Sequence, residues 1–151
     1  PYVDEQQVGA AGAVYVKDLD TFLPKTDFLS LHLPYTPKNH HIIGHEELRA
    51  LPSSAYVINT ARGGLIDEDE LFKALESGNL AGAGLDCFEQ EPPSKNLKLL
   101  TSGKVIVSPH NASLTAECTR RLGLVCVENV VDALTGCLKK ERVVNWDAVH
   151  A

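Results

Sequence analysis

The chain has 151 residues, 44% of them apolar, and a formal net charge of −6 at pH 7. This length and composition predict one folded domain and exclude an intrinsically disordered chain. The acidic balance, without basic clusters, argues against nucleic acid or an anionic membrane as a partner, and no apolar run approaches the ~18 residues of a membrane span.

Strands and helices are predicted to alternate along the first two thirds of the chain. Short apolar or β-branched runs predict strands at 13–16, 27–33, 55–60, 80–87 and 105–108. Helices are expected at 18–25, 46–51 and 67–77, with Asp18 and Asp67 as caps and Gly78 as a stop. The alternation predicts an α/β fold with a doubly wound parallel sheet.

A long helix is predicted at the C-terminal end, from Ser113 as its cap to about Lys139. Its apolar residues recur at helical spacing: Cys118, Leu122, Val125, Cys126, Ala133 and Cys137. At 1.5 Å per residue the helix would be roughly 39 Å long, which suggests that it crosses to something beyond this domain.

Four cysteines occur, at 87, 118, 126 and 137, and none forms a Cys-x-x-Cys pair. We expect reduced thiols that fill core space, in an intracellular, cytoplasmic protein without a signal peptide. The chain contains no methionine and opens on Pro1-Tyr2, so we expect it to be a piece of a longer protein.

Three predicted strands stop abruptly at polar groups. Arg62 follows the strand at 55–60, Asp86 ends the strand at 80–87, and His110 follows the strand at 105–108. The carboxyl ends of parallel strands share one edge of a sheet, so these side chains and the nearby Glu91 should meet there. A guanidinium, carboxylates and an imidazole together can anchor a carboxylate substrate and move a proton.

His110 can take or give a proton near neutrality, and a carboxylate from Glu91 on its other nitrogen would orient the ring. The alternative is that His110 only caps the helix at Ser113. Arg62 precedes Gly63-Gly64, where backbone can approach a ligand, and its fork suits a carboxylate. The alternative is a surface arginine in a turn.

Asp86 follows a strand of small residues that allows close approach by a flat ring, and it could accept from a carboxamide; the alternative is a turn or cap. His40, His41 and His45 resemble a metal cluster but lack companion ligands, so no metal is expected. The acidic run at 67–70 complements a helix dipole. Gly82-x-Gly84 is not a dinucleotide fingerprint, because no third glycine and no helix follow.

These stretches together resemble the D-isomer-specific 2-hydroxyacid dehydrogenases, closest to phosphoglycerate dehydrogenase-like and hydroxypyruvate/glyoxylate reductase-like members. The matching segments are 31–37 (LHLPYTP), 57–68 (VINTARGGLIDE), 84–92 (GLDCFEQEP) and 107–110 (VSPH), in the family's order. The resemblance reaches Asn145 near the end of the chain and implies a Rossmann-like sheet that is truncated at its N-terminus.

The resemblance implies roles for individual residues. Arg62 would bind the substrate carboxylate, His110 would be the acid/base, and Glu91 rather than Glu89 would be its partner. Asp86 would bind the nicotinamide carboxamide. The dinucleotide would be lined by Leu33, Pro34, Thr60, Ala61, Arg62, His110 and Ala112.

The family's glycine-rich turn and its acidic strand-end residue would precede Pro1, and Pro1-Tyr2 resembles the tail of the segment that carries that acid. We expect residues 1–112 to form the second half of an NAD-binding domain, and residues 113–151 a long helix and tail returning toward a substrate domain. The expected function is hydride transfer between NAD and a small D-2-hydroxy or 2-keto acid, in a homodimer. The alternative is a truncated, non-catalytic fragment that serves as a binding or dimerisation module.

Overall fold

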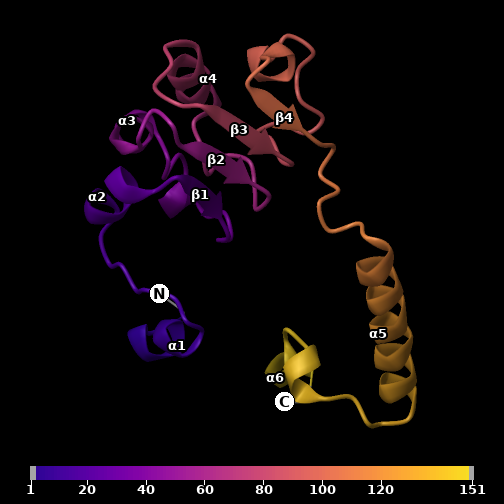
Figure 1. Ribbon diagram of the computed structural model, residues 1–151. Helices are drawn as coiled ribbons and strands as arrows, with labels where there is room; N and C mark the ends of the chain where they lie inside the picture. The colour runs from indigo at the N-terminus through magenta and orange to yellow at the C-terminus, as the bar shows by residue number, and fades with distance from the viewer. Residues whose placement is uncertain (1–2, 150–151) are drawn as a thin grey trace. The chain divides into compact units, whose positions relative to one another are not determined.

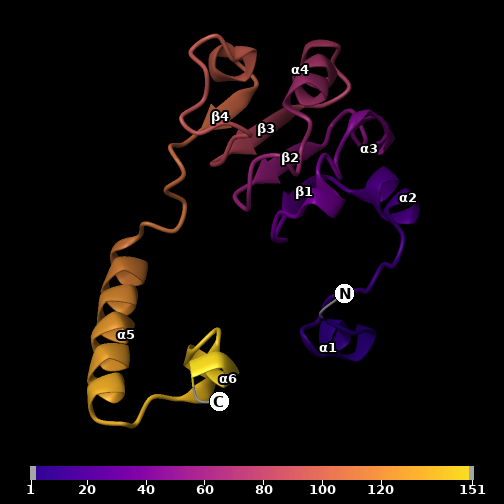
Figure 2. The ribbon, with the colours of Figure 1, turned by 180° about the vertical axis from the view of Figure 1, so that it is seen from behind.

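The computed structural model describes residues 3–149, so Pro1 and Tyr2, and with them the predicted tail of the acid-bearing segment, lie outside the described residues. The chain divides after His110 into two compact units, which are described separately below. Figures 1 and 2 show the strands of the first unit side by side and the long helix of the second.

The first unit is built on a four-stranded sheet in the order β1-β2-β3-β4, with every neighbouring pair parallel. The strands are β1 (Phe28–Leu31), β2 (Tyr56–Asn59), β3 (Gly82–Leu85) and β4 (Val105–Val107). Their register aligns the carboxyl ends, because Leu31 pairs with Asn59, Asn59 with Leu85, and Leu85 with Val107. The predicted Rossmann-like parallel sheet is confirmed.

Helices α3 (His45–Ala50) and α4 (Glu68–Glu76) connect successive strands. Right-handed crossovers that step in one direction place both helices on the same face of the sheet. Alternate strand residues on that face are buried: Leu29, Leu31, Val57, Asn59, Ala83 and Leu85. Except for the polar Asn59, they pack with Leu48, Leu71 and Leu75 of the helices into one apolar core. On the opposite face, Phe28 and Tyr56 are exposed and stack with ring centroids 5.6 Å apart.

Helix α4 begins where the sequence predicts, because the Asp67 carboxylate accepts from the Glu70 N–H at 3.0 Å. Gly78 follows its end with φ at +78°, a conformation that glycine adopts without strain. The stretch before β1 forms α1 (Glu5–Ala10), α2 (Leu19–Phe22) and the 3₁₀ turn η1 (Leu23–Lys25). Two further 3₁₀ turns lie after β1 and before β4: η2 (Pro37–Asn39) and η3 (Lys98–Thr101).

Two sequence predictions in this stretch are wrong. Residues 13–16 form no strand, and Val14 and Tyr15 are exposed, since no neighbouring strand offers them a ladder. Asp18 precedes α2, but its side chain makes no cap hydrogen bond; its carbonyl oxygen accepts from the Thr21 hydroxyl instead.

The second unit contains α5 (Ala116–Leu134), the 3₁₀ turn η4 (Lys140–Arg142) and α6 (Trp146–Val149). Thr115, not the predicted Ser113, caps α5, since its hydroxyl accepts from the Cys118 N–H at 3.1 Å. The helix ends at Leu134, before the predicted Lys139, and its 19 residues span roughly 28 Å. Cys137 lies beyond it. Within this unit Cys126 and Cys137 are exposed thiols, so the prediction that they fill core space is wrong.

Candidate active site

The turn after β2 is held by a buried side chain that sequence reasoning did not single out. Asn59 is 2% exposed and is the last residue of β2. Its amide nitrogen donates to the Arg62 carbonyl at 2.8 Å, and its amide oxygen accepts from the Ala61 N–H at 3.1 Å. The backbone on both sides of Arg62 is therefore fixed, while its guanidinium lies exposed at the sheet edge and donates to the Ala61 carbonyl at 2.6 Å.

Gly63 brings this turn against the loop that carries Glu91. A Cβ placed on Gly63 would lie 1.9 Å from the Phe88 carbonyl oxygen and 2.5 Å from the Glu89 nitrogen. No side chain fits this approach of backbone to backbone. Position 63 therefore requires glycine because of this backbone contact. This reason is separate from the predicted approach of a ligand to the Gly63-Gly64 backbone.

We expect Gly63→Ala to destabilise the chain by about 1–3 kcal/mol, because the two backbone segments must separate to admit the methyl group. Urea unfolding followed by circular dichroism measures the change. Gly103→Ala is the matched control, because a Cβ there meets nothing within 4 Å. Equal midpoints for the two variants would show that the Gly63 contact yields at no cost.

Glu91 and His110 are in contact, as their positions after β3 and β4 predict. The His110 Nδ1 lies 2.8 Å from Glu91 Oε2 and 3.0 Å from Oε1. The Phe88 N–H also donates to Glu91 Oε1 at 3.1 Å. The hydrogen bond from His110, followed by the bond from Phe88, holds the pKa of Glu91 below its ordinary value of 4.5. His110 itself has φ at +53°, a left-handed conformation that is uncommon outside glycine and often marks a functional position.

Asp86 directly follows β3 and is 3% exposed, and its carboxylate accepts from the Ser108 hydroxyl at 2.5 Å. The neighbouring Cys87 is also buried, and its thiol donates to the Asn59 carbonyl at 3.5 Å. Burial, and then the charges of Glu91 and Asp86, raise the pKa of the Cys87 thiol to about 11. Cys87 therefore remains protonated at neutral pH and packs beside the site without acting as a nucleophile.

Three hollows meet at this edge of the sheet. One of about 510 Å³ is lined by Arg62, Glu91 and His110, together with Tyr35, His40 and Gly64. A second, of about 550 Å³, is lined by Leu33, Pro34, Thr60 and Ala61, and it shares Tyr35 and Arg62 with the first. A third, of about 350 Å³, lies between Asp86, Ser108 and His110, with Pro93 and Leu100 as apolar walls. Ala112 belongs to the second unit, and its predicted role stays a prediction.

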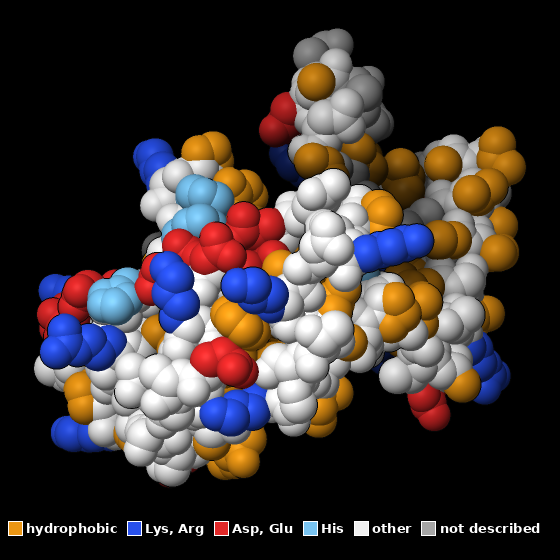
Figure 3. All heavy atoms as spheres, turned by 90° about the horizontal axis from the view of Figure 1, so that it is seen from above, with side chains coloured by type: hydrophobic (Ala, Val, Ile, Leu, Met, Phe, Trp, Pro, Cys, Tyr) orange, Lys and Arg blue, Asp and Glu red, His pale blue; other side chains and the backbone are white. Residues whose placement is uncertain are grey.

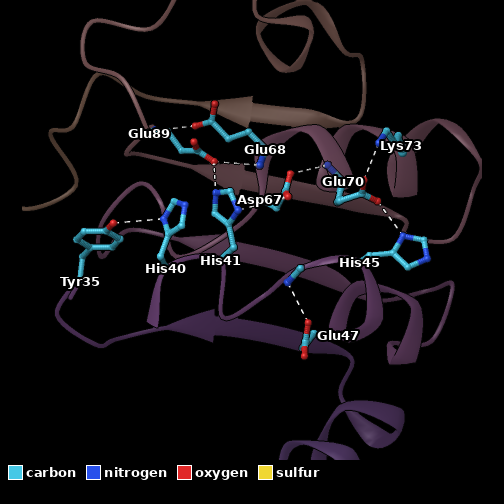
Figure 4. Close-up of polar contacts among 11 residues, drawn as sticks. Tyr35, His40, His41, His45, Glu47, Asp67, Glu68, Glu70, Lys73 and Glu89 are labelled. Carbon is cyan, nitrogen blue, oxygen red and sulfur yellow. Dashed lines mark hydrogen bonds and ion pairs between the residues drawn. The ribbon is translucent and has the colours of Figure 1, made fainter. Parts of the chain in front are cut away.

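Outside this pair, His40, His41 and His45 each face a carboxylate or a hydroxyl (Figure 4). His41 contacts Glu89 at 2.8 Å, His45 contacts Glu70 at 2.8 Å, and the Nδ1 of His40 lies 3.3 Å from the Tyr35 hydroxyl. Within residues 3–149, no group of three or more histidine, cysteine or acidic side chains is arranged to hold a metal ion. The same residues include no helix of sufficient length and apolar character to cross a membrane.

Sequence reasoning missed Asn59, Ser108 and the His41–Glu89 contact. Asn59 carried a signal, because it is a polar residue at an inward-facing position of an apolar strand. Ser108 and Glu89 carried none, since their partners lie 22 and 48 residues away in the sequence.

The profile of the "D-isomer specific 2-hydroxyacid dehydrogenase, NAD binding domain" family matches residues 1–112. The chain belongs to this family. NAD is the cofactor that defines the family's domain, and the predicted relationship is confirmed.

Relatives cover the chain well but extend beyond it. D-3-phosphoglycerate dehydrogenase of Methanocaldococcus jannaschii is 41% identical over 145 residues, which are 96% of this chain and 27% of that protein. Glyoxylate/hydroxypyruvate reductase B of Cronobacter sakazakii is 45% identical over 126 residues, covering 83% and 39%. The chain thus spans between about a quarter and two fifths of the length of these relatives.

Among solved structures, D-lactate dehydrogenase from Aquifex aeolicus, complexed with NAD and lactic acid, matches with a TM-score of 0.78 and 34% identity. The match covers 91% of this chain and 45% of that one. A 2-hydroxyacid dehydrogenase of Polaromonas matches with a TM-score of 0.82 and 27% identity, over 93% and 43%.

The described residues fit the nicotinamide end of the family's cofactor. The hollow beside Asp86 has apolar walls and the carboxylates of Asp86 and Glu91 in its lining, which suits a flat ring that carries a carboxamide donor. Gly84 of β3 precedes Asp86, and a Cβ on Gly84 would meet only Ile58, at 4.0 Å, so this face of the strand is open. The 151 residues contain no Gly-x-Gly-x-x-Gly, so a phosphate cradle of that kind is not supplied by this sequence.

Proposed function

We propose that this chain supplies the acid/base and carboxylate-binding groups of an NAD-dependent D-2-hydroxyacid dehydrogenase. The observation that carries the proposal is the 2.8 Å contact between His110 and Glu91, beside a hollow that Arg62 also lines. The names of the relatives, which include phosphoglycerate dehydrogenase and glyoxylate/hydroxypyruvate reductase, support a small 2-hydroxy or 2-keto acid as substrate.

Arg62 binds the substrate carboxylate in this proposal. Its guanidinium offers two parallel donors to a carboxylate, and the Asn59 contacts fix the backbone from which it extends. A 2-keto acid held in this way presents its carbonyl group in the hollow that His110 also lines.

His110 moves the proton. Because its Nδ1 faces Glu91, the ring carries a hydrogen there, and Nε2 is left to serve the substrate oxygen. In reduction, protonated Nε2 gives its proton to the carbonyl oxygen; in oxidation, neutral Nε2 takes the hydroxyl proton. NADH, when bound, supplies the hydride that adds to the carbonyl carbon. Glu91 stabilises the imidazolium and orients the ring.

Leu33, Pro34, Thr60 and Ala61 line the adjoining hollow and would contact the dinucleotide, with Asp86 facing the carboxamide. As functional parts, we assign residues 1–112 to the cofactor domain and 113–151 to a return toward a substrate domain. Free thiols at Cys87, Cys118, Cys126 and Cys137 favour a reducing, cytoplasmic location.

The test uses the complete dehydrogenase, by which we mean this chain joined to the remaining sequence that its longer relatives have. NADH oxidation is followed at increasing glyoxylate, hydroxypyruvate and pyruvate. Saturable turnover with at least one acid supports the proposal. If no acid is turned over, the proposed reaction is wrong.

The 151-residue chain alone should bind NAD weakly, because its sequence has no glycine-rich turn to hold the pyrophosphate. We expect dissociation constants above about 1 mM in isothermal titration, or binding energies weaker than about 4 kcal/mol. AMP titration is the control for adenine stacking. Micromolar NAD binding by this chain would contradict the prediction.

A second candidate function is a non-catalytic binding or dimerisation module. Helix α5 favours it, because Leu122, Val127 and Leu134 are more than half exposed within the second unit. We propose a homodimer through this apolar surface in either case. Light scattering that shows a monomer at high concentration would exclude it.

A further inference from the structure

Three segments that are distant in the sequence meet at His41. They are the segment before α3, the N-terminus of α4, and the loop between β3 and β4 that carries Glu91. His41 contacts the side chains of Asp67 and Glu89, and the Glu68 carboxylate accepts from the Glu89 N–H. We call these four residues the His41 cluster. Figure 4 shows these side chains turned toward one another, and Figure 3 shows histidines beside a group of carboxylates on this face.

The backbone of His41 is tied to the turn that carries Arg62. The His41 N–H donates to the Gly64 carbonyl at 2.7 Å. The pairing continues along the chain, since the Ile43 N–H donates to the Leu65 carbonyl at 3.0 Å and the Asp67 N–H to the Ile43 carbonyl at 3.1 Å. His41 therefore moves with the Arg62 turn as one body.

The side chain of His41 is tied to the loop that carries Glu91. Its Nε2 lies 2.8 Å from Glu89 Oε1, and Glu89 precedes Glu91 by two residues. Glu89 is also held by Glu68, because its N–H donates to the Glu68 carboxylate at 2.8 Å and its carboxylate accepts from the Glu68 N–H at 3.4 Å. His41 is thus a direct link between the segments of two proposed site residues.

The ring of His41 lies between two carboxylates. His41 Nδ1 lies 3.4 Å from Asp67 Oδ2, so both ring nitrogens face carboxylates. A neutral imidazole has one N–H and can donate to only one of them, whereas an imidazolium donates to both. Partial burial, and then the charge of Glu89, raise the pKa of Glu68, which shows how closely these carboxyl groups are gathered.

His40 also stacks on the His41 ring, with centroids 3.7 Å apart, and its Nδ1 contacts the Tyr35 hydroxyl. His41 also has φ at +52°, so its backbone is held in a conformation that costs energy outside glycine. The surrounding contacts offset that cost and keep the ring between Glu89 and Asp67.

We propose that His41 is a positioning residue for Glu91, and that it acts by clamping Glu89 to the Arg62 turn. The inference rests on the dehydrogenase function proposed above. Without the His41 ring, Glu89 loses its contact with the Arg62 turn, and the Glu91 loop becomes looser. His41 touches neither substrate nor cofactor in this proposal.

The Phe88 N–H reports on Glu91 directly, because it donates to Glu91 Oε1 at 3.1 Å. Amide hydrogen exchange of Phe88 is measured by NMR in this chain and is corrected for the intrinsic rate. In His41→Gln and in Glu89→Gln, protection of the Phe88 amide should be about threefold lower than in the wild type.

His45→Gln is the matched control. His45 makes the same type of contact, Nδ1 to Glu70 Oε2 at 2.8 Å, but it joins α3 to α4 and leaves the Glu91 loop alone. Its Phe88 protection should equal that of the wild type. Glu89→Gln keeps His41 and its backbone intact, so the test stands even if His41→Gln unfolds. Unchanged Phe88 protection in Glu89→Gln, or an equal loss in His45→Gln, would overturn the proposal.

The complete dehydrogenase adds a second readout. We expect Glu89→Gln to lower kcat for reduction by about threefold, with a smaller change in KM for the keto acid, because Arg62 is retained and Glu89, which also lines the hollow, keeps its shape as glutamine. An absence of turnover in the wild type would refute the proposed function but not the positioning of Glu91, which the Phe88 exchange decides separately. Equal kcat in wild type and variant would show that the clamp has no bearing on the reaction.

Discussion

Replacing Arg62 by lysine in the complete dehydrogenase is expected to lower kcat/KM for keto-acid reduction by roughly 10²-fold. Lysine keeps the positive charge but loses the planar pair of donors, and a hydrogen bond to a charged group contributes about 1.5–3 kcal/mol. The Asn59 contacts act on the backbone at position 62 and remain in the variant, so the loss reports on the guanidinium itself.

Steady-state kinetics with glyoxylate and hydroxypyruvate measure this change, and the dissociation constant of NADH should stay within about twofold, because the proposal gives the guanidinium to the substrate carboxylate. Arg49→Lys on α3 is the control, since Arg49 is an exposed guanidinium outside the three hollows at the sheet edge. An unchanged kcat/KM in Arg62→Lys would remove Arg62 from the substrate site.

Replacing Glu91 by glutamine is expected to lower the rate of reduction at neutral pH by about tenfold or more. Glutamine keeps the shape that receives His110 and the Phe88 N–H, but it deletes the charge that stabilises the imidazolium. Reduction needs the protonated ring, so the limb of its pH–rate profile should move to lower pH. Oxidation uses the neutral ring and should lose less rate there.

The direction in which the pH–rate profile moves follows from the pKa of Glu91, which is lowered by its hydrogen bonds to His110 and Phe88. A carboxyl group with a lowered pKa contributes its stabilisation above its ordinary value of 4.5 and loses it as pH falls through the lowered pKa. Glu91 is therefore ionised throughout the neutral range, and the limb that moves there belongs to the proton that Glu91 stabilises.

The control is Glu70→Gln, which removes a carboxylate from a histidine outside the site, at the same 2.8 Å from His45. Its pH–rate profile should match that of the wild type. If Glu91→Gln also left the profile of reduction in place, His110 would act with another partner and the pairing would have no catalytic role.

Much of this site could be predicted from the sequence, because its residues follow the ends of predicted strands. Arg62, Asp86 and His110 each follow a short apolar run, and parallel register alone brings such positions to one edge. The contact between Glu91 and His110 could be predicted for the same reason. Four family motifs in order then supplied the roles, which the 2.8 Å contact supports but which kinetics must test.

Predictions from local sequence patterns were wrong where the outcome depended on neighbouring parts of the structure. Residues 13–16 have the composition of a strand, yet a strand needs a ladder partner, and none is present for them in residues 3–149. Helix α5 is capped by Thr115 and not by the predicted Ser113. Several residues there can cap a helix, and only the backbone path decides which hydroxyl accepts from a free N–H.

By itself, the sequence determined the parallel sheet, the family and the edge at which its polar side chains gather, because these follow from periodicity and from motifs within single segments. Only the tertiary structure decided that Gly63 must abut the Phe88 carbonyl, that Ser108 donates to Asp86, and that His41 joins the Glu89 loop to the Arg62 turn. Those contacts join residues 22 to 48 positions apart, and their existence depends on loop paths that no local pattern encodes.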